Sequence, residues 1–414
     1  MLLCLQKALW ICFLCLMAGL LVCAALAMQD ILFVLALAAA LAAIFFWAAR
    51  HLAALQRPRA LEWPLRAGYA LFFVLLCVFG LLALPSPHSD LAAVYGSVPD
   101  VLDDFVLNGA YADYFIFYAP VFYTDAFAMF FLVAEAWLLF RFSQGGGLPA
   151  AAACGAMAGL GVLMKGTLAV PVVALAISIC FMGGLAVKKR LAGLAVLLGA
   201  LALCMAVPAW LVMHSGLVDF SRYDALGLPV ETWMCMSVHG GGAYCQDCVD
   251  YARSFATMAA RTEAMRARLA ALYQSYSLPE FLRFSALKTA TVWCDGSYEA
   301  LLYLKWPLRA NAFNAVFTGS CRGFWVWCNA YLVMLYGLNL ADALASLRQK
   351  EWDVRFFLRL CVFGLFLYFF LMEAAARRAL MVLPALLLGA VCTLWRMAGK
   401  EGAYAEQELE MEAV

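Results

Sequence analysis

The chain has 414 residues, of which 67% are hydrophobic and 13% are charged, and its formal net charge at pH 7 is +1. A soluble core of this length cannot bury so much apolar surface, so the composition excludes an ordinary soluble protein and indicates that the bilayer is the solvent. The balanced charge gives no reason to expect a nucleic acid or another acidic partner.

Apolar runs separated by short charged connections predict an all-α polytopic membrane protein with roughly ten transmembrane helices. The segment 50–66 carries four arginines, so by the positive-inside rule this segment and the N-terminus are expected to be cytoplasmic. The expected spans are residues 8–28, 31–49, 67–84, 115–140, 149–163, 167–182, 191–213, 324–344, 356–372 and 379–395.

The spans divide the chain into six predicted parts. These are N-terminal helices over 1–84, a first outer loop over 85–115, central helices over 116–213, a large outer loop over 214–322, C-terminal helices over 323–397 and a cytoplasmic tail over 398–414. In the large loop we expect one amphipathic helix, over 251–276, and apolar segments lying along the membrane surface. Glycines at 145–147 predict a turn, and the small residues of 149–163 predict close helix packing.

The first outer loop gathers carboxylates, and Asp90 is the best candidate for a reacting group. It directly follows the third span, where a carboxylate beside a low-dielectric wall can act as a general base or bind a divalent metal. His88 is either a metal ligand or orienting group, or an ordinary loop histidine, and we favour the second interpretation. The other carboxylates of this loop are Asp100, Asp103 and Asp104, which we expect to cap a helix, and Asp113. Asp125 lies inside the fourth span, where we expect it to hydrogen-bond within the bundle, with a role in substrate binding left open.

Ionisable groups at the ends of spans are functional candidates, because charge is costly at membrane depth. The predicted topology brings four of them to the outer face: Asp90, Lys165, Lys288, and Glu373 with Arg377 and Arg378. Each basic residue alone is explained equally well as a side chain that extends to the interface. The convergence of all four on one face indicates a site.

Cysteines give a weaker indication. Cys245 and Cys248 form a CQDC motif, with Cys235 and His239 upstream, and this spacing suits zinc. An outer, oxidising location favours a disulfide or free thiols instead, so no metal site is predicted. The chain has no phosphate-binding glycine loop and no GxSxG motif, so an enzyme of this kind takes an activated substrate from the membrane or from outside.

Several motifs together resemble the polytopic C-type glycosyltransferases (the GT-C superfamily), in the branch of dolichyl-phosphate-mannose protein mannosyltransferases and bacterial lipid-linked sugar transferases. The resemblance covers most of the chain. Its motifs are Asp90 in HSDLAAVYGSVPDVL, Tyr114, Phe115, Tyr118 and Pro120 before the fourth span, Lys165 and Thr167 in GAMAGLGVLMKGTLAV, Lys288 and Trp293 in LKTATVWCDGSY, and Glu373, Arg377 and Pro384.

The resemblance implies an inverting glycosyltransferase at the extracytoplasmic face of a bacterial plasma membrane. The donor is a polyprenyl-phosphate-linked sugar and the acceptor a glycan, lipid or protein, with membrane lipid as the surroundings and no nucleic acid. Asp90 would be the base, and Glu373 would orient Arg377. Residues that would contact substrate are His88, Tyr114, Tyr118, Lys165, Lys288, Trp293, Glu373, Arg377 and Arg378. No cofactor is required by this expectation, and a divalent cation stays open.

The alternative hypothesis is a transporter or flippase of a lipid-linked sugar. Such a protein carries charges near the bilayer midplane, on broken helices in two related halves. The sequence shows no related halves, and its boundary charges fall on one predicted face, so we favour the enzyme.

Overall fold

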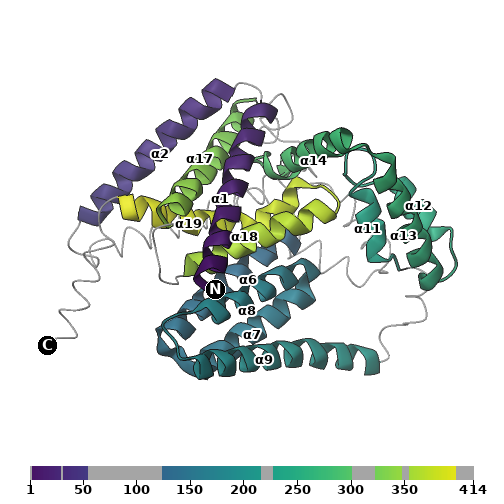
Figure 1. The fold of residues 1–414 in the computed structure, drawn as a ribbon, viewed down its shortest axis with the longest axis horizontal. Helices are drawn as coiled ribbons and strands as arrows, with labels where there is room; N and C mark the ends of the chain where they lie inside the picture. The colour runs from purple at the N-terminus through teal and green to yellow at the C-terminus, as the bar shows by residue number, and fades with distance from the viewer. Residues whose placement is uncertain are drawn as a thin grey trace, which may run out of the picture.

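The computed structural model describes residues 2–28, 31–54, 124–215, 227–300, 322–346 and 354–397, and within these ranges every regular element is a helix (Figure 1). The expectation of an all-α protein is confirmed. The helices are α1 (Leu2–Ala27), α2 (Ile31–Ala54), α6 (Thr124–Arg141), η1 (Phe142–Gly146), α7 (Gly147–Met164), η2 (Gly166–Leu168), α8 (Ala169–Phe181), α9 (Val187–His214), α11 (Val230–Met236), α12 (Gln246–Arg253), α13 (Met258–Ser275), α14 (Leu278–Trp293), α17 (Arg322–Ser346), α18 (Val354–Leu371), η3 (Ala376–Val382) and α19 (Leu383–Met397).

Seven stretches of the described chain are long and apolar enough to cross a membrane, which supports a multi-pass membrane protein. Large apolar side chains such as Leu26, Trp47 and Phe130 are exposed on the helix surfaces, as expected where lipid replaces water. The total of ten spans stays a prediction, because the third expected span, 67–84, lies outside the described residues.

One of these stretches, Ala128–Met164, contains two antiparallel helices, α6 and α7. The chain reverses at Gly145 (φ +91°) and Gly147 (φ +65°), in a backbone region that residues with a Cβ rarely adopt. Farther along the hairpin the Cys154 thiol lies 3.8 Å from the carbonyl oxygen of Glu135. The turn predicted at the three glycines is therefore confirmed.

Helix α7 packs very closely against α9, as its small residues predicted. A Cβ atom added at Gly155 would lie 2.1 Å from the carbonyl oxygen of Leu197. One added at Gly159 would lie 2.9 Å from that of Leu201. Two backbones can approach this closely only where side chains are absent, which is how membrane helices gain van der Waals contact without a hydrophobic driving force.

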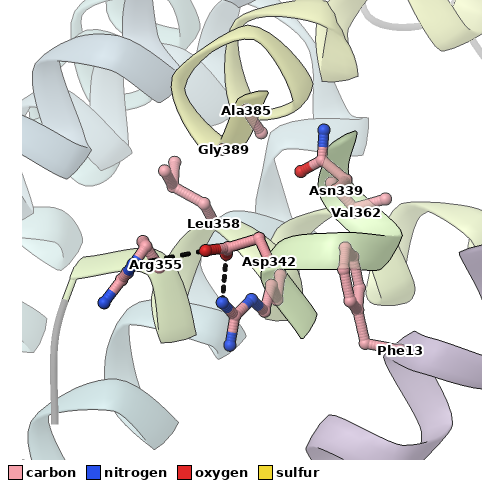
Figure 2. A pocket seen from close by; sticks show the side chains of 9 residues that line it. Phe13, Asn339, Asp342, Arg355, Leu358, Val362, Ala385 and Gly389 are labelled. Atoms are coloured by element: carbon pink, nitrogen blue, oxygen red, sulfur yellow. Dashed lines mark hydrogen bonds and ion pairs between the residues drawn. The ribbon is translucent and has the colours of Figure 1, made fainter. Parts of the chain in front are cut away.

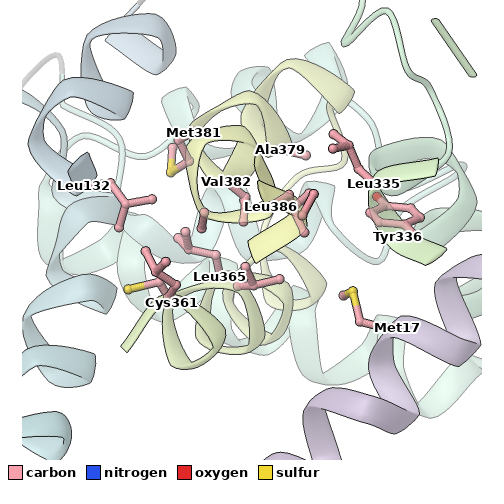
Figure 3. Close-up of a cluster of buried hydrophobic side chains, with 14 of the residues drawn as sticks. Met17, Leu132, Leu335, Tyr336, Cys361, Leu365, Ala379, Met381, Val382 and Leu386 are labelled. Atoms are coloured by element: carbon pink, nitrogen blue, oxygen red, sulfur yellow. The ribbon is translucent and has the colours of Figure 1, made fainter. Parts of the chain in front are cut away.

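The centre of the bundle is formed by α17, α18, η3 and α19, with α1 and α6 packed on it. Figure 3 shows side chains from these elements meeting, including Met17, Leu132, Tyr336, Leu365 and Leu386. Tyr336 in this core donates to the carbonyl of Trp293, 2.7 Å away, which fastens the end of α14 to α17.

The packing defines two ends of the bundle. Helix α8 runs antiparallel to α18, because Phe181 contacts Phe356 (ring centroids 5.5 Å apart) and Val170 packs on Gly364. We call the end where α18 starts the basic end, since Arg190, Arg355, Arg359 and Arg396 lie there. The opposite end, where α18 stops and α14 and η3 lie, is the loop end.

A small second core lies in the segment expected to be the large outer loop. Cys235, Met236, Cys248, Val249 and Met265 pack together between α11, α12 and α13, which stand beside α14 in Figure 1. These helices therefore form a compact helical cap rather than an irregular loop.

The single amphipathic helix predicted over 251–276 is wrong. The structure has two helices there, with a break at 254–257. The second helix starts at a new N-cap, where the Thr257 hydroxyl accepts from the backbone N–H of Ala260 at 3.3 Å. A threonine hydroxyl competes well with helix continuation, so the chain turns at this position.

Candidate functional site

Lys288 lies at the centre of the loop end, on α14. This helix begins with a capping box, in which the Glu280 carboxylate accepts from the backbone N–H of Ser277. Lys288 is 3% exposed, and its ammonium donates to the carbonyl of Ser237 at 3.0 Å and that of Phe370 at 2.7 Å. It thus ties α14, the cap and the end of α18 together.

Burial and the nearby Arg378 guanidinium lower the pKa of Lys288 to about 7. Both effects disfavour the charged ammonium. A neutral amine still has two N–H donors for the two carbonyls, so the contacts persist in either protonation state. Near neutral pH this side chain is therefore a titrating group and a structural tie, rather than a fixed positive charge.

A tight turn over 295–299 follows α14 and positions a carboxylate. The Asp295 carboxylate accepts from the backbone N–H groups of Ser297 and Glu299, each at 2.9 Å. Gly296 approaches the carbonyl of Cys328 so closely that an added Cβ would lie 2.2 Å from it. Tyr298 and Glu299 have positive φ angles of 51° and 65°, a strained backbone that the surrounding contacts hold in place.

Glu299 faces the segment that leads into η3. One carboxylate oxygen accepts from the Arg377 guanidinium at 2.9 Å, and the other accepts from the backbone N–H of Ala376 at 2.8 Å. These two bonds join residues 77 and 78 positions apart in the chain. Glu299 was not among the residues selected from the sequence, although the polar DGSYE run after the Lys288 motif marked the turn.

Arg378 is held by Glu373, at 2.8 Å, so the predicted pairing of Glu373 with Arg377 is wrong. That prediction assumed an α-helical turn, in which residues four apart are neighbours. In the structure Ala375 is extended and a 3-10 helix starts at Ala376, so α-helical spacing does not apply. Glu373 is almost completely buried, whereas about 20% of each arginine side chain is exposed.

Lys165 lies at the loop end too. It is the extended residue that ends α7, where the sequence predicted an interruption. Since Val170 of α8 packs on Gly364 and the two helices are antiparallel, Lys165 lies farther along, at the level where α18 ends. Lys165, Lys288, Glu373, Arg377 and Arg378 therefore occupy one end of the bundle, as the topology predicted.

Trp293 does not have the exposed position expected of a residue that contacts substrate. Its side chain is 3% exposed and packs against Phe366 and Phe369, with ring centroids 5.7 and 6.1 Å apart. Tyr298 is also buried, at 8% exposure. Both aromatic side chains are therefore part of the buried packing at the 295–299 turn.

The remaining candidates cannot be placed. Asp90, His88, Tyr114 and Tyr118 lie outside the described residues, and Asp125 is described only as part of the α6 backbone. Their roles stay predictions.

At the basic end the structure brings together a buried ionic cluster that sequence reasoning missed. Asp342 on α17 contacts Arg355 at 3.2 Å (Figure 2). It also contacts Arg396 at 2.9 Å, and Arg359. The Arg359 guanidinium also lies over the ring of Trp10, 5.5 Å from its centroid. A lone aspartate within an apolar helix was the available signal, because such a charge needs a partner.

The loop-end arrangement suits recognition of an anion. Two guanidinium groups are each oriented by one carboxylate contact, and Arg378 lies near Lys288. Lys165 lies at the same end of the bundle. A guanidinium has five N–H donors, so one carboxylate contact fixes the orientation of Arg378 without using all its donors. Phosphate and carboxylate oxygens are the acceptors that suit such guanidinium donors.

Comparisons with protein families, curated proteins and solved structures found no match to this chain.

Proposed function

We propose that the chain is an integral-membrane glycosyltransferase that moves a sugar from a polyprenyl-phosphate-linked donor to an acceptor at the extracytoplasmic face. The observation that carries this proposal is the gathering of Lys165, Arg377 and Arg378 at the loop end, opposite the arginine-rich basic end. By the positive-inside rule the basic end is cytoplasmic, which puts the loop end outside.

In the proposed reaction the acceptor oxygen attacks the anomeric carbon from the face opposite the phosphate. The bond between that carbon and the phosphate oxygen breaks, and the polyprenyl phosphate leaves with the electron pair. The acceptor proton passes to the carboxylate of Asp90, which acts as general base. Inversion at the anomeric carbon follows from this single displacement.

The role of the protein at the leaving group is electrostatic. Polyprenyl phosphate gains negative charge as it departs, and fixed cationic donors stabilise that charge more effectively than water does. Arg377 and Arg378 are suited to this task because Glu299 and Glu373 hold them in orientation before substrate arrives. Glu299 and Glu373 are then positioning residues.

The test is sugar transfer by purified protein in lipid, using a panel of radiolabelled polyprenyl-phosphate sugars. We expect transfer by the wild type, and a loss of transfer in Asp90→Asn without loss of carrier binding. Asp113→Asn, in the same acidic segment, is the matched control. Unchanged transfer by Asp90→Asn would remove this residue from the mechanism, and no transfer from any donor by the wild type would contradict the enzyme.

One observation favours the second candidate, a flippase of a lipid-linked sugar. Glu135 lies in the middle of α6, is fully buried, and has no hydrogen-bond partner for its carboxyl oxygens among the described residues. Ionisable groups at this depth are common in transport paths. The test is a vesicle assay of the flipping of lipid-linked sugars. This candidate would be supported if the wild type flips faster than protein-free vesicles do and if Glu135→Gln lowers that rate.

A further inference from the structure

The loop between α11 and α12 brings together three side chains that bind soft metal ions. The nitrogen and sulfur atoms of His239, Cys245 and Cys248 all lie within 4.8 Å of one another. The Cys245 sulfur lies 3.3 Å from Nδ1 of His239. Cys248 is fully buried, while His239 and Cys245 are half-buried, so the cluster is open to solvent on one side.

We propose that His239, Cys245 and Cys248 bind one zinc ion, with a solvent molecule as the fourth ligand. This inference is independent of the glycosyltransferase proposal. Two thiolates and one imidazole are ligands that zinc prefers, and the resulting site carries no net charge. Two sulfur ligands of one tetrahedral zinc lie about 3.8 Å apart, so the side chains need to close by only about 1 Å.

The local backbone favours this assignment. Cys245 is the N-cap of α12 and Cys248 lies in its first turn, so the start of one helix carries both thiols. His239 is brought back towards them by a turn in which Gly240 and Gly242 adopt positive φ angles of 57° and 80°. Sequence spacing alone indicated zinc only weakly, because CQDC lacks a second such pair.

The buried Cys248 thiol is stabilised in its protonated form. Burial, and then the hydrogen bond and charge of Cys245, raise the pKa of Cys248 to about 12. Arg268 acts in the opposite direction, since its positive charge lowers the pKa of this thiol. Binding of zinc would displace the proton of the Cys248 thiol.

Cys235 is close to this cluster and does not complete it. Its thiol donates to the carbonyl of Met265, 3.2 Å away, and burial raises its pKa to about 11. The fourth ligand position thus faces the open side, where solvent has access.

The proposed zinc site would act on the candidate site through the loop that carries it. The Ser237 carbonyl of that loop accepts from Lys288 at 3.0 Å, and the Gly242 carbonyl accepts from the backbone N–H of Ala374 at 2.6 Å. Ala374 directly follows Glu373. A metal that joins His239 to α12 would therefore hold the loop against both Lys288 and the Glu373–Arg378 pair.

The first measurement is the metal content of the purified protein, with cobalt substitution to report the ligands. We expect one zinc per chain, and a cobalt form with a thiolate-to-metal charge-transfer band and tetrahedral d–d bands. Cys245→Ser and His239→Gln, at half-buried positions, should each lower zinc affinity at least tenfold. Cys180→Ser is the matched control, since this exposed thiol lies at the basic end.

The competing outcome is a disulfide between Cys245 and Cys248. Mass spectrometry of thiol-blocked protein, with and without reductant, distinguishes it. If the reduced wild type, which needs no substitution and so carries no folding risk, fails to bind zinc or to give the cobalt thiolate band, the proposal is overturned. Zinc binding that survives in both Cys245→Ser and His239→Gln would also overturn it.

A second measurement tests the proposed link between the zinc site and the Glu373–Arg378 pair. Hydrogen exchange of 237–245 and 372–378 should slow in the zinc-loaded protein relative to the chelated protein, and this difference should vanish in Cys245→Ser. Zinc binding with unchanged exchange in both segments would contradict the proposed link to the Glu373–Arg378 pair.

Discussion

Three basic side chains at the loop end have fixed partners. Glu299 holds Arg377, Glu373 holds Arg378, and two backbone carbonyls hold Lys288. These pairs are partly exposed, so their contribution to stability is modest and their effect on orientation matters more. Lys288 differs, because it is buried with no carboxylate partner among the contacts of the described residues. Protonation of Lys288 should therefore lower the free energy of unfolding.

We predict that Lys288 makes stability depend on pH. Its folded-state pKa of about 7 lies below the ordinary 10.5, so between these values the unfolded chain binds more protons and stability rises with pH. Each pKa unit corresponds to about 1.4 kcal/mol, so the effect amounts to a few kcal/mol. Thermal unfolding in detergent at pH 7 and pH 9 should show a smaller rise in Lys288→Met than in wild type.

The control for this comparison is Lys189→Met, because Lys189 is exposed at the start of α9. It should keep the wild-type dependence. An equal rise with pH in Lys288→Met and wild type would show that Lys288 is charged at neutral pH.

At the basic end one buried charged group is a carboxylate, that of Asp342. Asp342 is 2% exposed, and its carboxylate contacts Arg355, Arg359 and Arg396 and neutralises part of their charge. Removing one partner of a buried ionic cluster leaves uncompensated charge, at a cost of about 3–5 kcal/mol. We expect Asp342→Asn to lower the unfolding temperature strongly, whereas Glu263→Gln on the exposed face of α13 should not. A small effect of Asp342→Asn would mean that water or lipid phosphate solvates these arginines.

Among the elements, the α7–α9 contact depends most directly on residue size. Gly155 and Gly159 leave room for the backbone of α9. The small residues of this helix predicted close packing, but the sequence did not indicate which helix it meets. The helix ends were harder to predict. Hydropathy placed the start of one span at 191, but α9 begins at Val187, because Lys188, Lys189 and Arg190 continue the helix beyond its apolar part.

We predict that Gly155→Ala destabilises the protein by about 1–3 kcal/mol, since its methyl group would overlap the Leu197 carbonyl. The matched control is Gly199→Ala on α9, where an added methyl meets nothing within 4 Å. That variant should be neutral or slightly stabilising, because alanine favours a helix over glycine. Comparable thermal unfolding of the two variants would contradict the close packing of α7 and α9.

Over the described residues, the sequence predicted the helical class and the position of Lys165, Lys288, Glu373, Arg377 and Arg378 at one end of the bundle. It did so because hydropathy and the positive-inside rule depend only on local composition. It did not predict which side chains pair. Glu299 and Arg377 are 78 positions apart, and the strained turn that brings Glu299 to η3 depends on a close approach of Gly296 to α17. Contacts of this kind arise from tertiary packing and leave no period in the sequence.

The two-ended distribution of charge is the basis of the proposed function, and it can be tested with one comparison. The measurement is the rate of sugar transfer from a polyprenyl-phosphate sugar by Arg378→Gln at the loop end and by Arg141→Gln at the end of α6, with unfolding temperatures measured in parallel. We predict a loss of about 100-fold or more in Arg378→Gln, the size expected for removing a donor to developing charge, and near wild-type transfer in Arg141→Gln. Equal transfer by the two variants, with both folded, would contradict a catalytic site at the loop end.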